Sequence, residues 1–265
     1  MNAEVTDLLE EKVVVVVGVG EGLGRAIAEQ CCHHGADVAL GARSEGYLKG
    51  LADELAEATG RGTFGHHVDI GEAAAVTAFR DAVLDRFGRV DTLVLNAADD
   101  EVTGPLEGGD IERWRRQMDL NVMGSMRVVQ AFAGDLKAGR GSVVFTDSMI
   151  VDKVLPTMGS YAMTKGALRV GARTLARELG ADGVRVNSVA PGWMWGASVE
   201  QYMEGVERDT GVTVAEQKAA IAAQFSLPDW PTEVDCANAV VFLASPLARA
   251  VTGVCLDVNA GELFR

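Results

Sequence analysis

Residues 13–24 read VVVVVGVGEGLG, a run of five valines that leads directly into a glycine-rich turn. A short continuous apolar run is typical of a strand that is buried on both faces of a parallel sheet. Residues 22–34 follow with the apolar periodicity of an amphipathic helix. A buried strand, a glycine-rich turn and a helix in this order predict a nucleotide-binding unit of the Rossmann type.

The glycines of this turn do not follow the common dinucleotide spacing G-x-G-x-x-G, because its third glycine would fall at Leu23. The spacing present is G-x-x-x-G-x-G, at Gly18, Gly22 and Gly24. The physics is the same, since glycines let the backbone approach a pyrophosphate and the helix N-terminus offers free N–H groups. A purely structural turn is the alternative, and the position between a buried strand and an amphipathic helix favours the nucleotide site.

Strand and helix patterns alternate along the 265 residues. Strands are predicted at residues 13–17, 37–42, 63–68, 92–96, 142–146, 185–190 and 254–258, and helices at 22–34, 45–59, 72–87, 112–137, 160–179 and 233–244. Such alternation predicts an α/β fold, a Rossmann-type doubly wound parallel sheet of about seven strands with helices on both faces. We expect residues 1–265 to form a single domain, with an insertion at about 191–230 that breaks the rhythm.

Composition excludes several other classes of protein. The formal net charge of −14 repels phosphate backbones, so nucleic acid is a poor partner. We find no signal peptide or membrane span, and four cysteines make no disulfide framework, so a reducing cytoplasm is expected. The run Cys31-Cys32-His33-His34 cannot converge on one metal ion, because successive helical residues point about 100° apart. No histidine lies beyond His67, which weakens a Ser-His-Asp hydrolase reading.

The end of the second predicted strand indicates which dinucleotide is bound. Arg43 lies nineteen residues after Gly24, where this architecture faces the adenosine ribose. An acid there accepts from the 2′-hydroxyl of NAD, whereas an arginine pairs with a 2′-phosphate, and Ser44 can add a hydroxyl donor. We therefore expect NADP(H) to be favoured over NAD(H), although Glu21 in the glycine turn argues against a phosphate nearby. A solvated surface arginine is the alternative.

Tyr161 and Lys165 stand four residues apart in the segment SYAMTK, at the start of a predicted helix, so their side chains share one face. We expect the ammonium to lower the pKa of the phenol from about 10 toward working pH, so that Tyr161 can exchange a proton with a carbonyl or alcohol oxygen. Ser148, just past a predicted strand, can hold the substrate oxygen. Asn121 is a poor interior residue for the helix in which it is predicted.

Over about residues 10–262 the chain resembles the short-chain dehydrogenase/reductase family. The resemblance rests on the turn at 18–24, Asn96-Ala97, Asn121, Ser148, Tyr161-x-x-x-Lys165, Pro191-Gly192 and Asp69, the last matching the family's adenine-binding acid.

The resemblance implies an NADP(H)-dependent oxidoreductase that interconverts a carbonyl and a secondary alcohol by hydride transfer. Tyr161 would be the general acid/base and Ser148 would orient the substrate oxygen. Lys165 would hold the nicotinamide ribose and tune Tyr161, and Asn121 would keep a water that links Lys165 to solvent. The implied cofactor-binding residues are Gly18, Gly20, Gly22, Leu23, Gly24, Arg43, Ser44, Asp69, Ile70, Asn96, Ala97, Tyr161, Lys165, Pro191 and Gly192.

Departures from the family pattern leave these catalytic groups in place. Asp147 stands where a serine is common, and Gly196 stands where a threonine usually contacts the nicotinamide carboxamide. The other departures are Val17 for Thr, Leu95 and Ala98 for the outer Asn and Gly of Asn-Asn-Ala-Gly, and Val151 for Gly. Together they leave the sub-family and the anchoring of the nicotinamide open.

Residues 191–230, where the family builds its substrate lid, are rich in large apolar side chains. These are Trp193, Met194, Trp195, Tyr202, Met203, Phe225 and Trp230. They can cover a bulky apolar substrate, or they can pack against the body or a partner subunit, and the two readings are equally supported. The helices at 112–137 and 160–179 carry many small or apolar residues, and the family pairs them in dimers or tetramers, so we expect a homo-oligomer.

Two rival functions remain beside a carbonyl reductase or alcohol dehydrogenase. One is an epimerase or dehydratase on the same scaffold. The other is a catalytically idle NADP(H)-binding regulator, which the presence of both Tyr161 and Lys165 disfavours.

Overall fold

One parallel sheet takes strands from the whole length of the chain in this computed structural model, which describes residues 7–100 and 102–265. Within those residues its order is β3-β2-β1-β4-β5-β6-β7. The strands are β1 (Val13–Val17), β2 (Asp37–Ala42), β3 (Thr63–His67), β4 (Thr92–Leu95), β5 (Ser142–Thr146), β6 (Arg185–Pro191) and β7 (Cys255–Val258). The order reverses direction between β1 and β4, which confirms the predicted doubly wound Rossmann-type sheet.

The valine run forms the centre of the sheet. β1 pairs with β2 on one side and β4 on the other, in a register that places Val17 opposite Gly41 and Leu95. Successive strand residues point to opposite faces, so Val14 and Val16 join one apolar core while Val15 and Val17 join the other. All five valines are at most 5% exposed, which explains why the strand carries no polar alternation.

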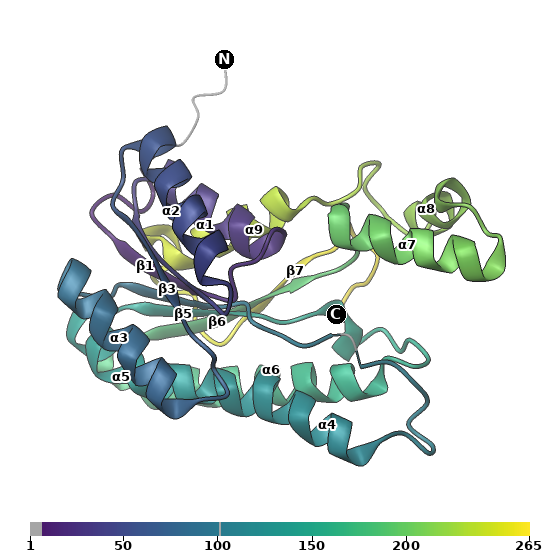
Figure 1. Ribbon diagram of the computed structural model, residues 1–265, viewed down its shortest axis with the longest axis horizontal. Coiled ribbons are helices and arrows are strands. Elements are labelled where there is room, and N and C mark those ends of the chain that lie inside the picture. Colours follow the sequence, from purple (N-terminus) through teal and green to yellow (C-terminus); the bar gives the residue numbers. More distant parts are fainter. Residues whose placement is uncertain (1–6, 101) are drawn as a thin grey trace.

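Helices cover both faces of the sheet (Figure 1). One core contains α1 (Leu23–His33), α2 (Glu45–Thr59) and α9 (Glu233–Ala244). The opposite core contains α3 (Ala73–Phe87), α5 (Ser125–Gly139) and α6 (Gly159–Leu179), with α4 (Ile111–Met118) beside α6. Short 3₁₀ turns at Met149–Val151, Gly180–Asp182 and Pro246–Ala248 join these elements.

The single helix predicted at residues 112–137 is not continuous. Between α4 and α5 the backbone winds as a π-helical turn, Asp119–Gly124. Asn121 at its centre has its amide bonded outside the helix, donating to Asp99 O at 2.9 Å and to Thr164 Oγ1 at 3.0 Å. Single π turns inside helices are frequent at functional sites, and here the turn directs a buried amide toward α6.

Residues 191–230, where an insertion is predicted, follow β6. They contain α7 (Ala197–Thr210) and α8 (Val214–Ala222), which extend past one end of the sheet in Figure 1. Among the described residues, no helix is both long and apolar enough to cross a membrane.

Candidate active site

Two adjoining cavities lie at the carboxyl ends of the strands, where the strand order reverses between β1 and β4. The first, of about 370 Å³, is lined by residues that follow β1, β2, β3 and β4. The second, of about 360 Å³, is lined by residues that follow β5 and β6 and by the start of α6. Leu23, Asn96 and Ala98 line both cavities, so the two form one continuous site. A doubly wound sheet binds its ligand at this position.

The first cavity gathers most of the predicted cofactor residues. Those lining it are Gly18, Gly20, Gly22, Leu23, Gly24, Arg43, Ser44, Asp69, Ile70, Asn96 and Ala97. The glycine turn packs tightly on the end of β4: a Cβ at Gly18, which has φ +95°, would lie 2.2 Å from the Ala97 nitrogen. Asn96 ties the two together by donating its amide N–H to Gly18 O at 2.8 Å.

The same turn leaves room and donors for a phosphate. A Cβ built at Gly20 would meet nothing within 4 Å. No side chain of the described residues caps the N-terminus of α1; the Arg25 N–H donates to Gly20 O at 3.1 Å, and the N–H groups that precede it can bind an anion. Arg43 is exposed at the cavity wall, and no ion pair joins it to another residue of the described chain. Backbone donors and one available cation fit a dinucleotide phosphate.

The second cavity brings the predicted catalytic side chains together. Ser148 follows β5, Tyr161 and Lys165 lie one turn apart on α6, and all three line the cavity with Pro191 and Gly192. Lys165 is 2% exposed and donates to Thr146 O at 2.7 Å. The Ser148 hydroxyl oxygen accepts the N–H of Ile150 at 3.2 Å, which leaves its proton free for another acceptor.

The electrostatics of this pair correct the expectation from sequence. Burial raises the pKa of Tyr161 above its ordinary value, and the charges of Asp100 and Asp147 raise it further, although a hydrogen bond with Ser148 acts in the opposite direction. The Lys165 ammonium, 5.5 Å from the centroid of the Tyr161 ring, does not reverse this rise. Burial lowers the pKa of Lys165 to about 8, and the same two carboxylates limit that fall.

Asn121 is fully buried and lines neither cavity. Its Oδ1 accepts the N–H of Asp99 at 2.7 Å, and its amide donates to Thr164 Oγ1, which in turn donates to Tyr161 O at 2.8 Å. The residue thus joins the loop after β4 to the turn of α6 that carries Tyr161. The water link to Lys165 that the resemblance implies stays a prediction.

Sequence reasoning missed two acids and part of the apolar wall of the second cavity. From the sequence, Asp147 is only a departure from the serine that is common at its position, and no motif points to Asp100 as a site residue. The further apolar lining residues are Met149, Ile150, Leu155, Met158 and Val199.

The aromatic residues of the insertion divide between the two readings. Trp193 and Met194 line the cavity, as a substrate-covering role requires. Trp195 and Trp230 instead pack edge to face, with ring centroids 5.6 Å apart, and the Lys218 ammonium lies 3.3 Å from the Trp195 centroid. Part of the apolar surface is therefore used to hold the insertion to itself.

The Gly196 departure has a steric counterpart. A Cβ at position 196 would lie 2.6 Å from Glu233 Oε1, and one at Gly22 would lie 2.9 Å from the same oxygen. Glu233, at the first turn of α9, therefore occupies the space that a threonine at 196 would need, and burial raises the pKa of its carboxyl.

A family model described as enoyl-(acyl carrier protein) reductase matches residues 18–262. The short-chain reductase protein NovJ of Streptomyces niveus is 32% identical over 255 residues, which cover 96% of this chain and 94% of that protein. Carveol dehydrogenase from Mycobacterium avium, solved in complex with NAD, superposes with a TM-score of 0.90 at 28% identity and covers 98% of this chain and 100% of its own. L-Sorbose reductase from Gluconobacter frateurii, complexed with NADPH and L-sorbose, gives 0.89 at 27% identity, with coverage of 98% and 100%.

Proposed function

The chain belongs to the short-chain dehydrogenase/reductase family and is an oxidoreductase that uses a nicotinamide cofactor, and from this premise we propose that it is an NADP(H)-dependent enzyme interconverting a carbonyl and a secondary alcohol. One observation carries the proposal: Ser148, Tyr161 and Lys165 line a single cavity that is continuous with the glycine-lined cavity beside it. This continuity supports a reaction in which the cofactor would act on the carbonyl carbon while the acid/base groups act on its oxygen.

The bound nicotinamide supplies the hydride, and the protein supplies position and a proton. Ser148 can donate its hydroxyl proton to the substrate oxygen, which orients and polarises the carbonyl. Tyr161 then gives its proton to that oxygen as it becomes an alcohol. A phenol with an ordinary pKa of about 10 is protonated at neutral pH, and the raised pKa of Tyr161 keeps its proton available for the substrate oxygen. Lys165, whose pKa burial lowers to about 8, would hold the ribose while its ammonium is protonated.

Arg43 supports NADP(H) over NAD(H). Its guanidinium is exposed at the wall of the first cavity beside Ser44, and no carboxylate of the described residues competes for it in an ion pair. A charge-assisted pair with a 2′-phosphate is stronger than a neutral hydrogen bond to a ribose hydroxyl.

The second cavity suits an uncharged substrate with an apolar body. Its wall is largely apolar, and among its described lining residues the only cation is Lys165, which is buried. Asp100 is exposed in the same wall and its charge reaches Tyr161. A carboxylate there disfavours an anionic substrate. Reduction of acetophenone should exceed that of 4-acetylbenzoate, and Asp100→Asn should narrow the ratio of their kcat/KM values by about threefold, the scale of one exposed charge. An unchanged ratio in the variant would remove Asp100 from substrate selection.

A homo-oligomer is part of the proposal. Met163 and Val170 on α6 and Met123 on the π turn are 44%, 64% and 50% exposed, which leaves apolar surface on the helices expected to pair. Light scattering at micromolar concentration should give a mass that is a multiple of 28.0 kDa, and a stable monomer would contradict this.

The function is tested by following NADPH absorbance with a panel of ketones and, in the reverse direction, NADP⁺ with secondary alcohols. Turnover of at least one carbonyl with NADPH supports the oxidoreductase. Cofactor binding with no turnover on any pair would favour the regulator. Isomerisation or water loss without net change in the cofactor would favour the epimerase or dehydratase.

A further inference from the structure

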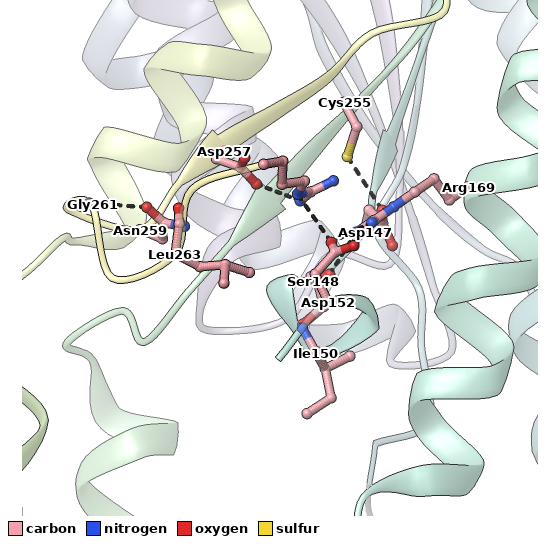
Figure 2. A network of polar contacts seen from close by, with 11 residues as sticks. Asp147, Ser148, Ile150, Asp152, Arg169, Cys255, Asp257, Asn259, Gly261 and Leu263 are labelled. Carbon is pink, nitrogen blue, oxygen red and sulfur yellow. Dashed lines mark hydrogen bonds and ion pairs between the residues drawn. The ribbon is translucent and has the colours of Figure 1, made fainter. Parts of the chain in front are cut away.

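A chain of buried charges lies directly behind Ser148 (Figure 2). Asp147 precedes the serine and is 1% exposed, and Arg169 reaches it from α6 with 6% exposure. The Arg169 network, as we name it, consists of Arg169, Asp147, Asp152 and the main chain of Ser148. A buried carboxylate beside a catalytic group is costly unless it is paired, so its presence calls for a reason.

Arg169 continues the catalytic face of α6. Tyr161, Lys165 and Arg169 follow one another at intervals of four residues, so all three project from the same side of the helix toward the end of β5. Lys165 holds Thr146 O at 2.7 Å. One turn later Arg169 holds the next residues of the same segment.

The guanidinium of Arg169 contacts both sides of the serine. Its Nε donates to the Asp147 carboxylate, its Nη1 donates to the Asp152 carboxylate, and its Nη2 donates to Ser148 O at 3.0 Å. Burial opposes the charge of Arg169, yet the hydrogen bonds to Asp152 and Asp147 offset it, so the pKa of Arg169 is raised and the group stays charged. A planar group with five donors can make these three contacts at once, which a lysine cannot.

The charge of Asp147 acts on the catalytic lysine, because it raises the pKa of Lys165 against the effect of burial. Asp147 Oδ1 is buried and has no hydrogen-bond partner among the described residues. Asp147 and Lys165 line the same cavity. Arg169 is therefore the group that satisfies the Asp147 charge, and without it Lys165 is the cation left in that cavity to do so.

We propose that Arg169 is a positioning residue for the reaction: it fixes the segment that carries Ser148 and keeps the Asp147 carboxylate from drawing Lys165 away from its place beside Tyr161. This inference rests on the proposed function, since it concerns how the acid/base groups are held. It also accounts for Asp147 where a serine is common, because an acid at that position requires the arginine opposite.

Other charged groups face this cluster and set the baseline for a pH experiment. Asp100 comes from the loop after β4, Asp152 from the turn after β5, and Asp257 from β7. Arg265 bridges the last two, with its Nε 3.0 Å from Asp152, and the Cys255 thiol donates to Asp147 Oδ2 at 3.3 Å. Tyr161 and Lys165 are the titrating groups on α6 itself.

The test removes the charges of Arg169 and Asp147 and measures NADPH affinity against pH, which needs no turnover. NADPH affinity, measured by fluorescence, should fall in the wild type as Lys165 loses its proton near pH 8. In Arg169→Gln the uncompensated Asp147 charge favours the protonated form of Lys165. The midpoint of the pH dependence of NADPH affinity should therefore rise by about one pH unit, and kcat should fall about 30-fold. The double variant Asp147→Asn/Arg169→Gln should return the midpoint to the wild-type value and recover kcat at least fivefold over Arg169→Gln.

Two further variants separate charge from geometry. Arg169→Lys keeps a cation for Asp147 but cannot reach three acceptors, so the midpoint should stay near the wild-type value while kcat falls. Asp147→Asn alone removes an anion near Lys165, so the midpoint should move below the wild-type value. If Arg169→Gln does not fold, this variant tests whether the Asp147 charge acts on Lys165. Arg173→Gln, which changes an exposed arginine on the same helix, is the matched control and should change neither quantity.

An unmoved midpoint in both Arg169→Gln and Asp147→Asn would overturn the proposal, as would a double variant no better than the single. Circular dichroism and Tm identify variants that are merely unfolded. If the wild type binds NADPH but turns over no carbonyl, the proposed function fails while the midpoints still test the role of Arg169.

Discussion

The two cavities of the active site are built in different ways. The cofactor cavity is made mainly of backbone: glycines, the free N–H groups of α1 and an exposed arginine that follows β2. The catalytic cavity has a largely apolar wall in which β5 and α6 bring together a few charged and polar side chains, with β7 contributing to the network behind them. Backbone sites depend on local conformation, whereas buried charges depend on every partner that compensates them. The first should therefore respond to steric changes and the second to charge changes.

The largest effect should come from a steric change in the cofactor cavity. Gly18→Ala places a Cβ 2.2 Å from the Ala97 nitrogen at φ +95°, whereas Gly20→Ala places one in open space. A left-handed backbone costs an ordinary residue about 1–2 kcal/mol before any overlap is counted. Gly18→Ala should thus lower the Tm by roughly 10 °C or more, on the scale of a few degrees per kcal/mol for a domain of this size.

Gly20→Ala is the matched control and should leave the Tm within about 1 °C of the wild type. Differential scanning calorimetry compares the two directly. Equal melting of both variants would mean that the turn is not packed on β4 as described.

The next effect sharpens the comparison from the catalytic side. Because the pKa of Lys165 is about 8, raising the pH from 7 to 9 removes the ammonium charge from most molecules, and NADPH affinity should fall about tenfold. Lys165→Met, which keeps the length of the side chain, should bind weakly at pH 7 and show no such fall. Fluorescence titrations at each pH test this, and a wild-type affinity that is flat between pH 7 and 9 would contradict it.

The third effect concerns cofactor choice. Arg43→Ala removes one exposed cation from the cavity wall, so NADPH affinity should fall about tenfold, equivalent to about 1.4 kcal/mol, while NADH affinity changes less than twofold. Isothermal titration calorimetry with both cofactors measures this. If the wild type prefers NADH, then Arg43 is a solvated residue and the NADP(H) assignment is wrong.

The same contrast explains what sequence alone could predict. The cofactor cavity could be predicted from local sequence patterns, because the valine strand, the glycine turn and the following helix are contiguous. Residues 45–59 were likewise predicted with the bounds that α2 has. The π turn at Asn121 was missed because an amide bonded to Asp99 and Thr164 requires contacts 22 and 43 residues away. Hydrophobic periodicity does not report such contacts.

The limit of prediction from sequence is clearer in the catalytic cavity. The four-residue spacing correctly put Tyr161 and Lys165 on one face, but it gave the wrong direction for the pKa of Tyr161. Burial and the charges of Asp100 and Asp147 raise it, and these two acids come from the segments that follow β4 and β5. The pairing of Asp147 with Arg169 had no local signal, because the two residues lie 22 positions apart, one just after β5 and the other on α6.

The proton donor is the central claim, and a single-turnover comparison of the wild type with Tyr161→Phe tests it most directly. The enzyme is preloaded with NADPH and mixed in a stopped-flow instrument with a carbonyl substrate that the panel identifies. Removing the hydroxyl while keeping the ring should leave NADPH affinity and Tm unchanged and slow NADPH oxidation by about 100-fold or more, the scale of a lost general acid. Near-wild-type oxidation by Tyr161→Phe, with Ser148→Ala abolishing it, would show that Tyr161 is not the acid.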